Sequence, residues 1–500
     1  MNSNRNKINS QGERTWWAPL LCLLIGCASL FPACDQLEEH YSTNPNLRLD
    51  FSTDTLAFDT VFTTVGSATR QFMIYNRNQE PLDIESVLLA SGGETGFRIN
   101  VDGRKGVAFD HVGILDQDSL YVFVEVTVNP THQNQPLLIQ DSIIFQVNGI
   151  RQHVLLEACG QDVHLCKGGV RLERDTLLAA DRPYLVYDSL VVAPDVRVTI
   201  EPGATFYMHD QASMVVYGSM QAKGTREAPI TIRGDRLDNL LTDLPYDRTP
   251  GLWGGIFFQS TSFDNLWEHV IVRNGTSGVI LAASTPEQSK IQIRQSQITH
   301  MKGNVLTAVN CRMEVSDSEL SNASGAVLLL AGGKYDLTHC TMANYMRLAL
   351  VDTLEKVSVA LLNVLSDQEM YPLEARFRNC IIDGGNSNEL LIQTTDQVAA
   401  DYQFDHCMVK LRNPEAATAT HFTDCLVRGW SPTYRSTGDS DTDYVYDFRL
   451  ASDTTLCVGS ADVEVSREYP IDRFGIDRLH SEKGPSIGAY EYVTIEDEEQ

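Results

Sequence analysis

A 22-residue period in the second half of the chain constrains its fold more than any other feature. The period relates three pairs of short runs, namely 291–293 with 296–298, 313–315 with 318–320, and 335–337 with 340–342. Leu306, Leu328 and Leu350 continue the same register. Within each run apolar residues alternate with polar ones, which is the pattern of a β-strand with one buried face. A constant period of this length indicates a solenoid, in which each unit covers the apolar face of its neighbours.

Further copies of the unit appear later in the chain, at 377–382, 404–409 and 422–427. The intervals between them vary, and a solenoid tolerates this because insertions leave it as loops. The runs 198–203, 215–225 and 229–234 resemble the opening coils of surface β-helix proteins, and 469–473 with 484–491 resembles the closing segment of bacterial ones. These resemblances imply an all-β chain in which residues 163–493 form a right-handed parallel β-helix of the pectate-lyase-like kind, with N-terminal and C-terminal caps.

The repeat also explains most of the cysteines. Cys340, Cys380, Cys407 and Cys425 occupy the slot that Ser296 and Ser318 hold in earlier units. Free cysteine packs as a small apolar side chain, so we expect a ladder of buried thiols, with disulfides between neighbouring units as the alternative. The 11 cysteines include no CxxC pair, and the sequence predicts no metal site and no cofactor. Turn or edge positions are expected for His269, His339 and His406.

Residues 45–162 show a different pattern, with alternating runs of strand length separated by turn residues. The predicted strands are 47–51, 60–64, 70–76, 82–89, 120–128, 142–147 and 153–157. Asn148-Gly149, between the last two, is a strong signal for a two-residue hairpin turn. Short strands in this arrangement favour a β-sandwich. The runs 58–61, 74–76, 81–84 and 158–160 resemble those of immunoglobulin-like modules of the abnormal-spindle and Hydin type, which implies a spacer or docking role.

The amino terminus has the pattern of an export signal. Basic residues precede an apolar run over residues 16–33, and such a lead is typical of a cleaved signal. Residues 1–33 are therefore predicted to be a lipoprotein signal peptide, with Cys34 as the lipid-attachment site and Cys27 as the alternative. A plain cleaved signal and a single membrane-spanning helix remain open as other interpretations.

Acidic residues follow this run. Residues 34–44 are predicted to form an acidic tether, and 494–500 an acidic tail. The tether resembles the surface-export tags of lipoproteins from the Bacteroides group. This resemblance implies a bacterial outer-membrane protein that is lipid-anchored and exposed at the cell surface.

The formal net charge of −27 argues against a nucleic-acid partner, because phosphate backbones are bound by concentrated Lys and Arg. The expected partners are the membrane, through the lipid anchor, and polysaccharide or envelope proteins.

Catalytic signatures of β-helix enzymes are missing from the sequence. It contains neither an Asp-Asp pair nor a Gly-His-Gly, both typical of polygalacturonases. The candidates that remain are Glu314 and Asp336, one unit apart on an outward column, with Asp317 and His339 on the adjoining turn. Two carboxylates this close raise a pKa or recruit a cation. Arg312 and Lys334 are expected to balance them, which favours a solvated, salt-bridged face.

A charged insertion between Arg233 and Trp253 is a second candidate site. Its candidate binding residues are Asp235, Asp238, Asp243, Tyr246, Asp247 and Arg248. Loops on rigid scaffolds often carry binding residues. The alternative is a surface loop closed by its own ion pairs.

These patterns favour a non-catalytic cell-surface lipoprotein that presents a β-helix for adhesion, glycan contact or envelope assembly. The alternative is a polysaccharide lyase or glycoside hydrolase with an atypical active site on a β-helix.

Overall fold

The computed structural model describes residues 40–130, 134–241, 244–346, 356–438 and 444–494. The predicted signal peptide, Cys27, Cys34, Asp243 and Leu350 lie outside these residues. Within them the chain consists mainly of β-strands. Internal contacts divide it into two compact units: the first comprises the chain up to Leu56, Ala68–Glu125 and Gln140–Glu157, and the second comprises Ala57–Ser67, Val126–Ile139 and Ala158–Gln500.

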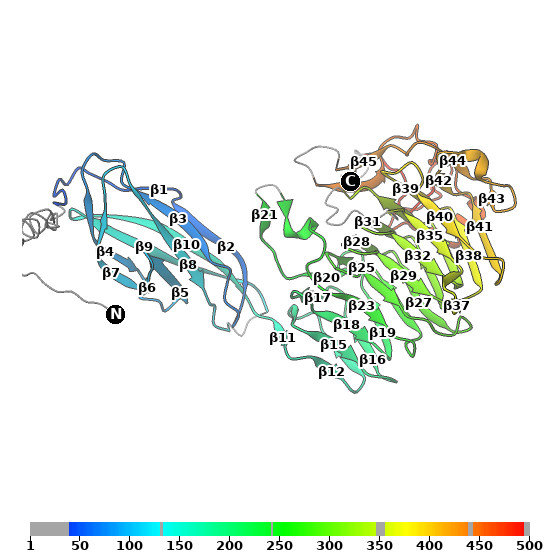
Figure 1. Cartoon of the computed structure of the whole chain (residues 1–500), viewed down its shortest axis with the longest axis horizontal. Helices are drawn as coiled ribbons and strands as arrows, with labels where there is room; N and C mark the ends of the chain where they lie inside the picture. Colours follow the sequence, from blue (N-terminus) through cyan, green and yellow to red (C-terminus); the bar gives the residue numbers. More distant parts are fainter. Residues whose placement is uncertain (1–39, 131–133, 242–243, 347–355, 439–443, 495–500) are drawn as a thin grey trace, which may run out of the picture. The chain divides into compact units, whose positions relative to one another are not determined.

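Two five-stranded sheets form the N-terminal part of the chain (Figure 1). The first consists of β1 (Asp50–Phe51), β3 (Arg70–Tyr75), β8 (Ser119–Val126), β5 (Phe97–Val101) and β6 (Arg104–Gly106). The second consists of β2 (Thr55–Phe62), β10 (Ile150–Gln161), β9 (Leu137–Val147), β4 (Leu82–Leu89) and β7 (Ala108–Ile114). The rings of Phe72 on β3 and Phe145 on β9 meet edge to face, with centroids 6.3 Å apart. The apolar faces of the two sheets therefore share a core.

The predicted turn at Asn148-Gly149 joins β9 to β10, with φ of 49° and 76° at its two residues. The predicted strand 82–89 coincides with β4, whereas β5, β6 and β7 were not predicted. A glycine-rich stretch precedes β5, β6 is a short polar run, and the alternation of β7 is broken at His111, whose φ is 50°. Strand β5 itself alternates regularly, with Phe97, Ile99 and Val101 buried.

Three long parallel sheets form most of the second unit (Figure 1). Sheet 1 consists of β11 (His164–Cys166), β14 (Tyr184–Val186), β17 (Thr205–Met208), β20 (Ile230–Gly234), β25 (Val270–Arg273), β28 (Gln297–Met301), β31 (Glu319–Ala323), β34 (Thr341–Asn344), β39 (Ile381–Gly384), β42 (Met408–Lys410) and β44 (Leu426–Arg428). Sheet 2 consists of β12 (Val170–Leu172), β15 (Ser189–Val192), β18 (Ser213–Val216), β23 (Gly255–Phe258), β26 (Val279–Leu281), β29 (Leu306–Val309), β32 (Leu328–Ala331), β35 (Val359–Leu362) and β40 (Leu390–Gln393). Sheet 3 consists of β13 (Thr176–Leu178), β16 (Arg197–Ile200), β19 (Ser219–Lys223), β24 (Asn265–Glu268), β27 (Ser289–Arg294), β30 (Arg312–Ser316), β33 (Gly333–Thr338), β38 (Leu373–Arg378), β41 (Ala400–Asp405) and β43 (Phe422–Thr423).

From β11 to β41 the chain visits sheets 1, 2 and 3 in turn, so each circuit adds one strand to each sheet; the last circuit, from β42 to β44, adds none to sheet 2. This is the arrangement of a parallel β-helix, and the prediction of an all-β chain with a parallel solenoid is confirmed. The 22-residue register is also confirmed, because Ile291 pairs with Met313 and Met313 with Tyr335. Leu306 pairs with Leu328, but Val359 rather than Leu350 follows in sheet 2, since a longer connection separates β34 from β35.

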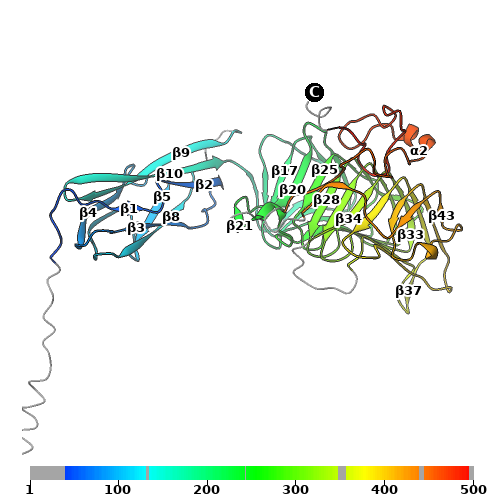
Figure 2. The same ribbon diagram turned by 90° about the horizontal axis from the view of Figure 1, so that it is seen from above.

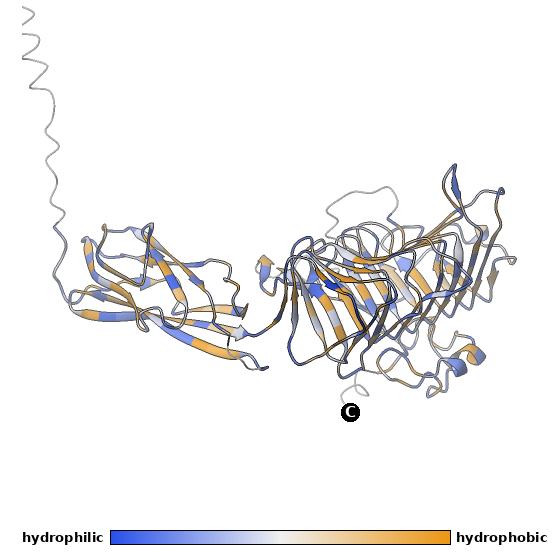
Figure 3. Cartoon of the chain, turned by 90° about the horizontal axis from the view of Figure 1, so that it is seen from below, coloured by the Kyte–Doolittle hydropathy of each residue, from blue (hydrophilic) through white to orange (hydrophobic). Residues whose placement is uncertain are grey.

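Inward side chains of the coils fill a continuous apolar core. Along the strands of the coils hydrophobic residues alternate with hydrophilic ones (Figure 3). The rings of Phe377, Phe404 and Phe422 stack on one another with centroids 4.8 Å apart. This distance is the spacing of neighbouring strands in a sheet, about 4.8 Å, so identical side chains stack in register.

A column of left-handed residues links sheet 3 to sheet 1 and is called here the 3–1 turn column. Its members are His269, Gln295, Asp317, His339, Asn379, His406 and Asp424, whose φ angles lie between 47° and 53°. Asn, Asp and His tolerate positive φ better than most residues. This preference explains why polar residues recur at this sharp turn in seven successive coils, from β24 to β44.

The residue after each turn points inward and forms the expected ladder. The amide of Ser296 donates to Oγ of Ser318 at 3.0 Å, and the amide of Cys380 donates to Sγ of Cys407 at 3.4 Å. Among the described residues Cys340, Cys380, Cys407 and Cys425 are free thiols, the first three of them buried. Side chains in a parallel ladder stand side by side, and here they bind the backbone of the adjacent coil.

The remaining elements are short. They are the hairpins β21 (Asn239–Leu241) with β22 (Leu244–Pro245), β36 (Val364–Ser366) with β37 (Glu369–Met370), and β45 (Tyr434–Thr437) with β46 (Tyr446–Leu450), and the helices η1 (Tyr246–Arg248), η2 (Pro414–Ala416) and α2 (Val463–Glu468). Among the residues described, no helix combines the length and apolar character that crossing a bilayer requires.

Residues 457–492, called here the C-terminal segment, run along the side of the coils with α2 (Figure 2). The segment binds the 3–1 turn column at several points. Nε2 of Gln295 donates to the carbonyl of Asp472 at 3.2 Å, and the amide of Gly488 donates to the carbonyl of Asn379 at 2.9 Å. The turn column is therefore partly covered by a segment that is far away in the sequence.

Candidate functional site

A polar groove of about 650 Å³ lies over the outward face of sheet 3 and is called here the sheet 3 groove. Side chains of β24, β27, β30, β33 and β38 line it, and residues 468–471 of the C-terminal segment add to its lining. Its charged lining residues are Glu268, Arg294, Glu314, Asp317, Asp336, Arg378 and Glu468.

Two outward rows of sheet 3 carry most of these charges. In the first row Gln292, Glu314 and Asp336 are register partners on successive strands. In the second row Arg294, Ser316, Thr338 and Arg378 are register partners in the same way. Because neighbouring strands lie about 4.8 Å apart, members of one row stand side by side. The groove therefore presents one amide and two carboxylates in its first row. The second row contains two guanidinium groups and also includes Glu268, the register partner of Arg294.

The carboxylates of the groove sit in different environments. Glu314 forms an ion pair with Arg312 at 3.0 Å, and Glu268 forms one with Arg294 at 3.5 Å. Burial raises the pKa of Asp336, Arg378 opposes this shift, and the adjacent Glu314 adds to it. Asp336 therefore keeps its proton to a higher pH than a free aspartate does.

The structure brings together some of the sequence-predicted residues and separates others. Glu314 and Asp336 are neighbours in one row. Arg312 pairs with Glu314 as expected, but Nζ of Lys334 lies 3.2 Å from Oε1 of Glu287 instead of balancing Asp336. The neighbouring positions of Glu314 and Asp336 follow directly from the 22-residue register.

Asp317 and His339 do not lie on the strands of sheet 3, because both belong to the 3–1 turn column. Asp317 lines the groove, yet its Oδ1 is bound by Nη2 of the buried Arg478 at 2.9 Å. Burial raises the pKa of Asp317 to about 6, with Arg478 opposing the shift. His339 is fully buried, and its Nε2 lies 3.0 Å from Oγ of Ser466. Burial holds the pKa of His339 well below its usual value, so it is a neutral partner of the C-terminal segment.

The candidate loop between Arg233 and Trp253 is closed by its own interactions. Asp247 binds both Arg233, at 2.9 Å, and Arg273, at 3.0 Å. Nη2 of Arg236 lies 2.6 Å from Asp238, and its guanidinium lies 4.1 Å from the ring centre of Tyr246.

The remaining members of the loop are placed as follows. Nδ1 of His209 lies 2.6 Å from Asp235, and Arg248 ends η1. Asp243 lies outside the described residues. Asp235, Asp238 and Asp247 thus each bind a basic side chain of the chain, which favours the interpretation of a loop closed by ion pairs.

Sequence reasoning missed Glu268, Arg294 and Arg378 as members of the groove. Arg294 and Arg378 could have been found from the repeat, because each lies two residues after another outward position of its strand and therefore on the same face. The wall at residues 468–471 has no such signal, because it lies outside the repeat. Of the described residues, the one group of His and carboxylate side chains close enough to share a metal ion lies outside the groove, at Asp405, His406 and Asp462.

No family model matches the chain. A segment of 139 residues, 27% of the chain, is 32% identical to "Protein bark beetle" of Drosophila melanogaster and spans 4% of that protein's length. Among solved structures, a family 123 glycoside hydrolase from Clostridium perfringens matches 24% of this chain and 30% of its own, with 7% identity and a TM-score of 0.17. The ASH/PapD-like domain 7 of human CEP192 matches 26% of this chain and 96% of its own, with 8% identity and a TM-score of 0.17.

Proposed function

We propose that the chain is a non-catalytic, lipid-anchored surface protein whose sheet 3 groove binds an extended polysaccharide. The observation that carries this proposal is the polar lining of the groove across five successive strands of sheet 3. Carboxylates accept hydrogen bonds and guanidinium groups donate them, so the two rows complement the hydroxyl groups of a sugar chain. A polymer lying along the coils would meet an outward polar side chain at each coil.

The N-terminal sheets are proposed to be an immunoglobulin-like sandwich that acts as a spacer, and the solenoid to be a right-handed, pectate-lyase-like β-helix. Support for the sandwich comes from its two sheets with a shared core and from the motifs noted in the sequence. The lipid anchor, the bacterial outer-membrane location and surface exposure rest on the sequence of the amino terminus.

The test is a glycan array of neutral and uronic-acid polysaccharides probed with the full-length protein. For a glycan that binds, affinity is then measured for Asp336→Asn and Arg378→Gln, and for Glu173→Gln as the control. Glu173 has a side chain 77% exposed and lies outside the groove. The two groove variants should lose about 1–3 kcal/mol of binding free energy each through a missing polar partner, and the control should bind as the native chain does. Equal binding by all variants would remove the groove from the proposal.

A second candidate function is cleavage of the bound glycan. Two observations favour it, namely the register pairing of Glu314 with Asp336 and the raised pKa of Asp336, since glycoside hydrolysis uses one protonated and one ionised carboxyl group. Incubation of the protein with the glycans it retains distinguishes the two functions. Product release that disappears in both Glu314→Gln and Asp336→Asn would establish cleavage, whereas retention without products supports binding alone.

A further inference from the structure

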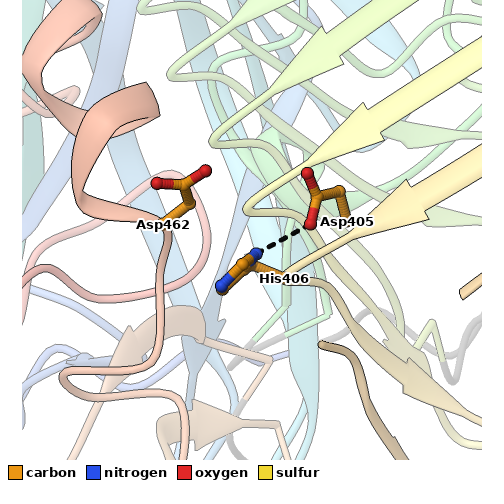
Figure 4. A group of neighbouring side chains, drawn as sticks. All are labelled: Asp405, His406 and Asp462. Carbon is orange, nitrogen blue, oxygen red and sulfur yellow. Dashed lines mark hydrogen bonds and ion pairs between the residues drawn. The ribbon is translucent and has the colours of Figure 1, made fainter. Parts of the chain in front are cut away.

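A second cluster of side chains, at the last coils of the solenoid, has the composition of a metal site. Asp405, His406 and Asp462 each offer one ligand atom, and these atoms all lie within 4.8 Å of one another. Figure 4 shows the three side chains turned toward one another, with Asp405 and His406 on the coil and Asp462 just before α2. None of the three lines the sheet 3 groove.

The coil positions the first two side chains. Asp405 is the last residue of β41, and His406 follows it in the 3–1 turn column with φ of 48°. This turn directs both side chains away from the core, whereas Cys407, the next residue, points inward. Nδ1 of His406 lies 2.7 Å from Oδ1 of Asp405, which is within the usual range for a hydrogen bond.

The adjacent coil positions the third side chain. Nδ2 of Asn379 donates to the carbonyl of Asp462 at 3.1 Å, and the amide of Asp462 donates to Oδ1 of Asn379 at 2.8 Å. Oδ1 of Asp462 also accepts the amide of Glu464 at 2.8 Å. The carboxylate is therefore held in place while its second oxygen remains available to the cluster.

The electrostatics of the cluster favour a bound cation. Two carboxylates face a single imidazole, and Asp424 follows His406 in the turn column. A cation placed between two carboxylates is attracted by both of them. One imidazole nitrogen with two carboxylate oxygens is a ligand set that divalent transition metals accept.

We propose that Asp405, His406 and Asp462 bind one divalent transition-metal ion, which fastens the C-terminal segment to the last coils. Bonds from such an ion to nitrogen or oxygen measure about 2.0–2.2 Å, so rotation of the side chains must draw the ligand atoms closer together. The ion takes the place of the hydrogen bond between Asp405 and His406, and the imidazole proton then resides on Nε2. Two ligands belong to the coil and one to the segment, so binding stabilises their contact by mass action.

The test uses the full-length protein, stripped of metal by a chelator and titrated with Mn²⁺ at neutral pH and moderate salt. Mn²⁺ suits the two carboxylate ligands and is a poor match for thiolates, which matters in a chain with 11 cysteines. The variants are His406→Gln and Asp462→Asn. The control is His209→Gln, which removes a similar pair, His209 with Asp235 at 2.6 Å, that has no third ligand.

The native chain and the control should each take up one tightly bound Mn²⁺, detected by the loss of the free-ion paramagnetic resonance signal. Both cluster variants should bind at least about tenfold more weakly. The proposal is overturned if the native chain shows no tight saturable uptake, or if His406→Gln binds as the native chain does.

A second measurement guards against variants that fold poorly. Mn²⁺ should raise the midpoint of thermal unfolding for the native chain and for His209→Gln, and should leave that of Asp405→Asn unchanged. A variant whose unfolding midpoint without metal matches the native one counts as folded. An equal rise for Asp405→Asn would place the ion elsewhere and refute the site.

Discussion

At the scale of single residues, the buried ion pair of Asp317 and Arg478 links the solenoid to the C-terminal segment. The side chains are 7% and 0% exposed, and the ion pair measures 2.9 Å. Replacing Arg478 by Gln leaves Asp317 buried without its cation, which costs about 3–5 kcal/mol of unfolding free energy. Urea unfolding at neutral pH should show this loss, while Arg467→Gln, which removes an exposed pair with Glu464, should stay within about 0.5 kcal/mol of the native value. Similar midpoints for the two variants would contradict the structural role of the pair.

Glu389 makes stability depend on pH. Its side chain is fully buried, its carboxylate accepts the amides of Ser358 and Asn386, and burial raises its pKa to about 7. The folded state therefore holds this proton more tightly than the unfolded state, whose pKa is near 4.5. The stabilising effect of the proton is present below that value and is lost as pH rises to about 7, by up to about 1.4 kcal/mol per pH unit.

Glu389→Gln should flatten this dependence between about pH 5 and 7. Thermal unfolding followed across that range gives the slope for each chain. The exposed Glu374→Gln is the control, and its slope should match the native one. An unchanged slope in Glu389→Gln would show that Glu389 is ionised in the folded chain throughout the range.

The sequence predicts residue neighbours only where the repeat provides a register. Glu314 and Asp336 are neighbours because they are 22 positions apart. Asp317 and Arg478 are 161 positions apart, and Arg478 lies outside the repeat, so no periodic signal connects them. The proximity of His406 to Asp462 was not predictable for the same reason, since Asp462 also lies outside the repeat.

At the scale of elements, the C-terminal segment docks through close backbone approach. Gly488 has φ of 102°, its amide binds the carbonyl of Asn379, and a Cβ there would lie 2.8 Å from side-chain atoms of Ile381 and Thr341. Gly488→Ala should therefore loosen the segment and speed its removal by limited proteolysis.

The matched control for this change is Gly484→Ala. Gly484 also has positive φ, at 91°, but a Cβ there would meet only atoms of Gly459 at 3.8 Å or more. Both variants carry the backbone strain of a left-handed residue, and only Gly488→Ala adds the steric conflict. Cleavage at the same rate in both would mean that docking does not depend on close approach at Gly488.

Elements were predictable where strand alternation is regular. The short strands of sheets 1 and 3 follow the repeat, and the hairpin at Asn148-Gly149 follows from turn chemistry. Strand β6 has three residues and no apolar side chain, and the alternation of β7 is broken at His111, whose φ is 50°. Strand β5 is the exception, because it alternates regularly at Phe97, Ile99 and Val101 and was missed all the same. The course of the C-terminal segment depends on contacts with distant coils, which local sequence does not encode.

At the scale of the whole molecule, the sequence predicts the class of fold better than it predicts function. A solenoid is specified by its period, since every coil repeats the same burial pattern. The groove depends on which outward residues happen to stand together, and on a wall supplied by a segment outside the repeat. Function therefore has to be tested at the groove and at the membrane.

The proposed membrane anchor gives the last prediction. An acylated cysteine at the start of the mature chain supplies several acyl chains, and stable anchoring needs more than one. If Cys34 is the attachment site, Cys34→Ser expressed in a bacterial host that processes lipoproteins should lose incorporation of labelled palmitate and leave the membrane fraction. Cys27→Ser should keep both, because the apolar run continues from Cys27 to residue 33 and turns polar only at Asp35. Loss of label in Cys27→Ser alone would move the site to Cys27 and place residues 28–33 in the mature protein, whereas label in neither native chain nor variants would refute the anchor and leave the chain to reach its glycan without one.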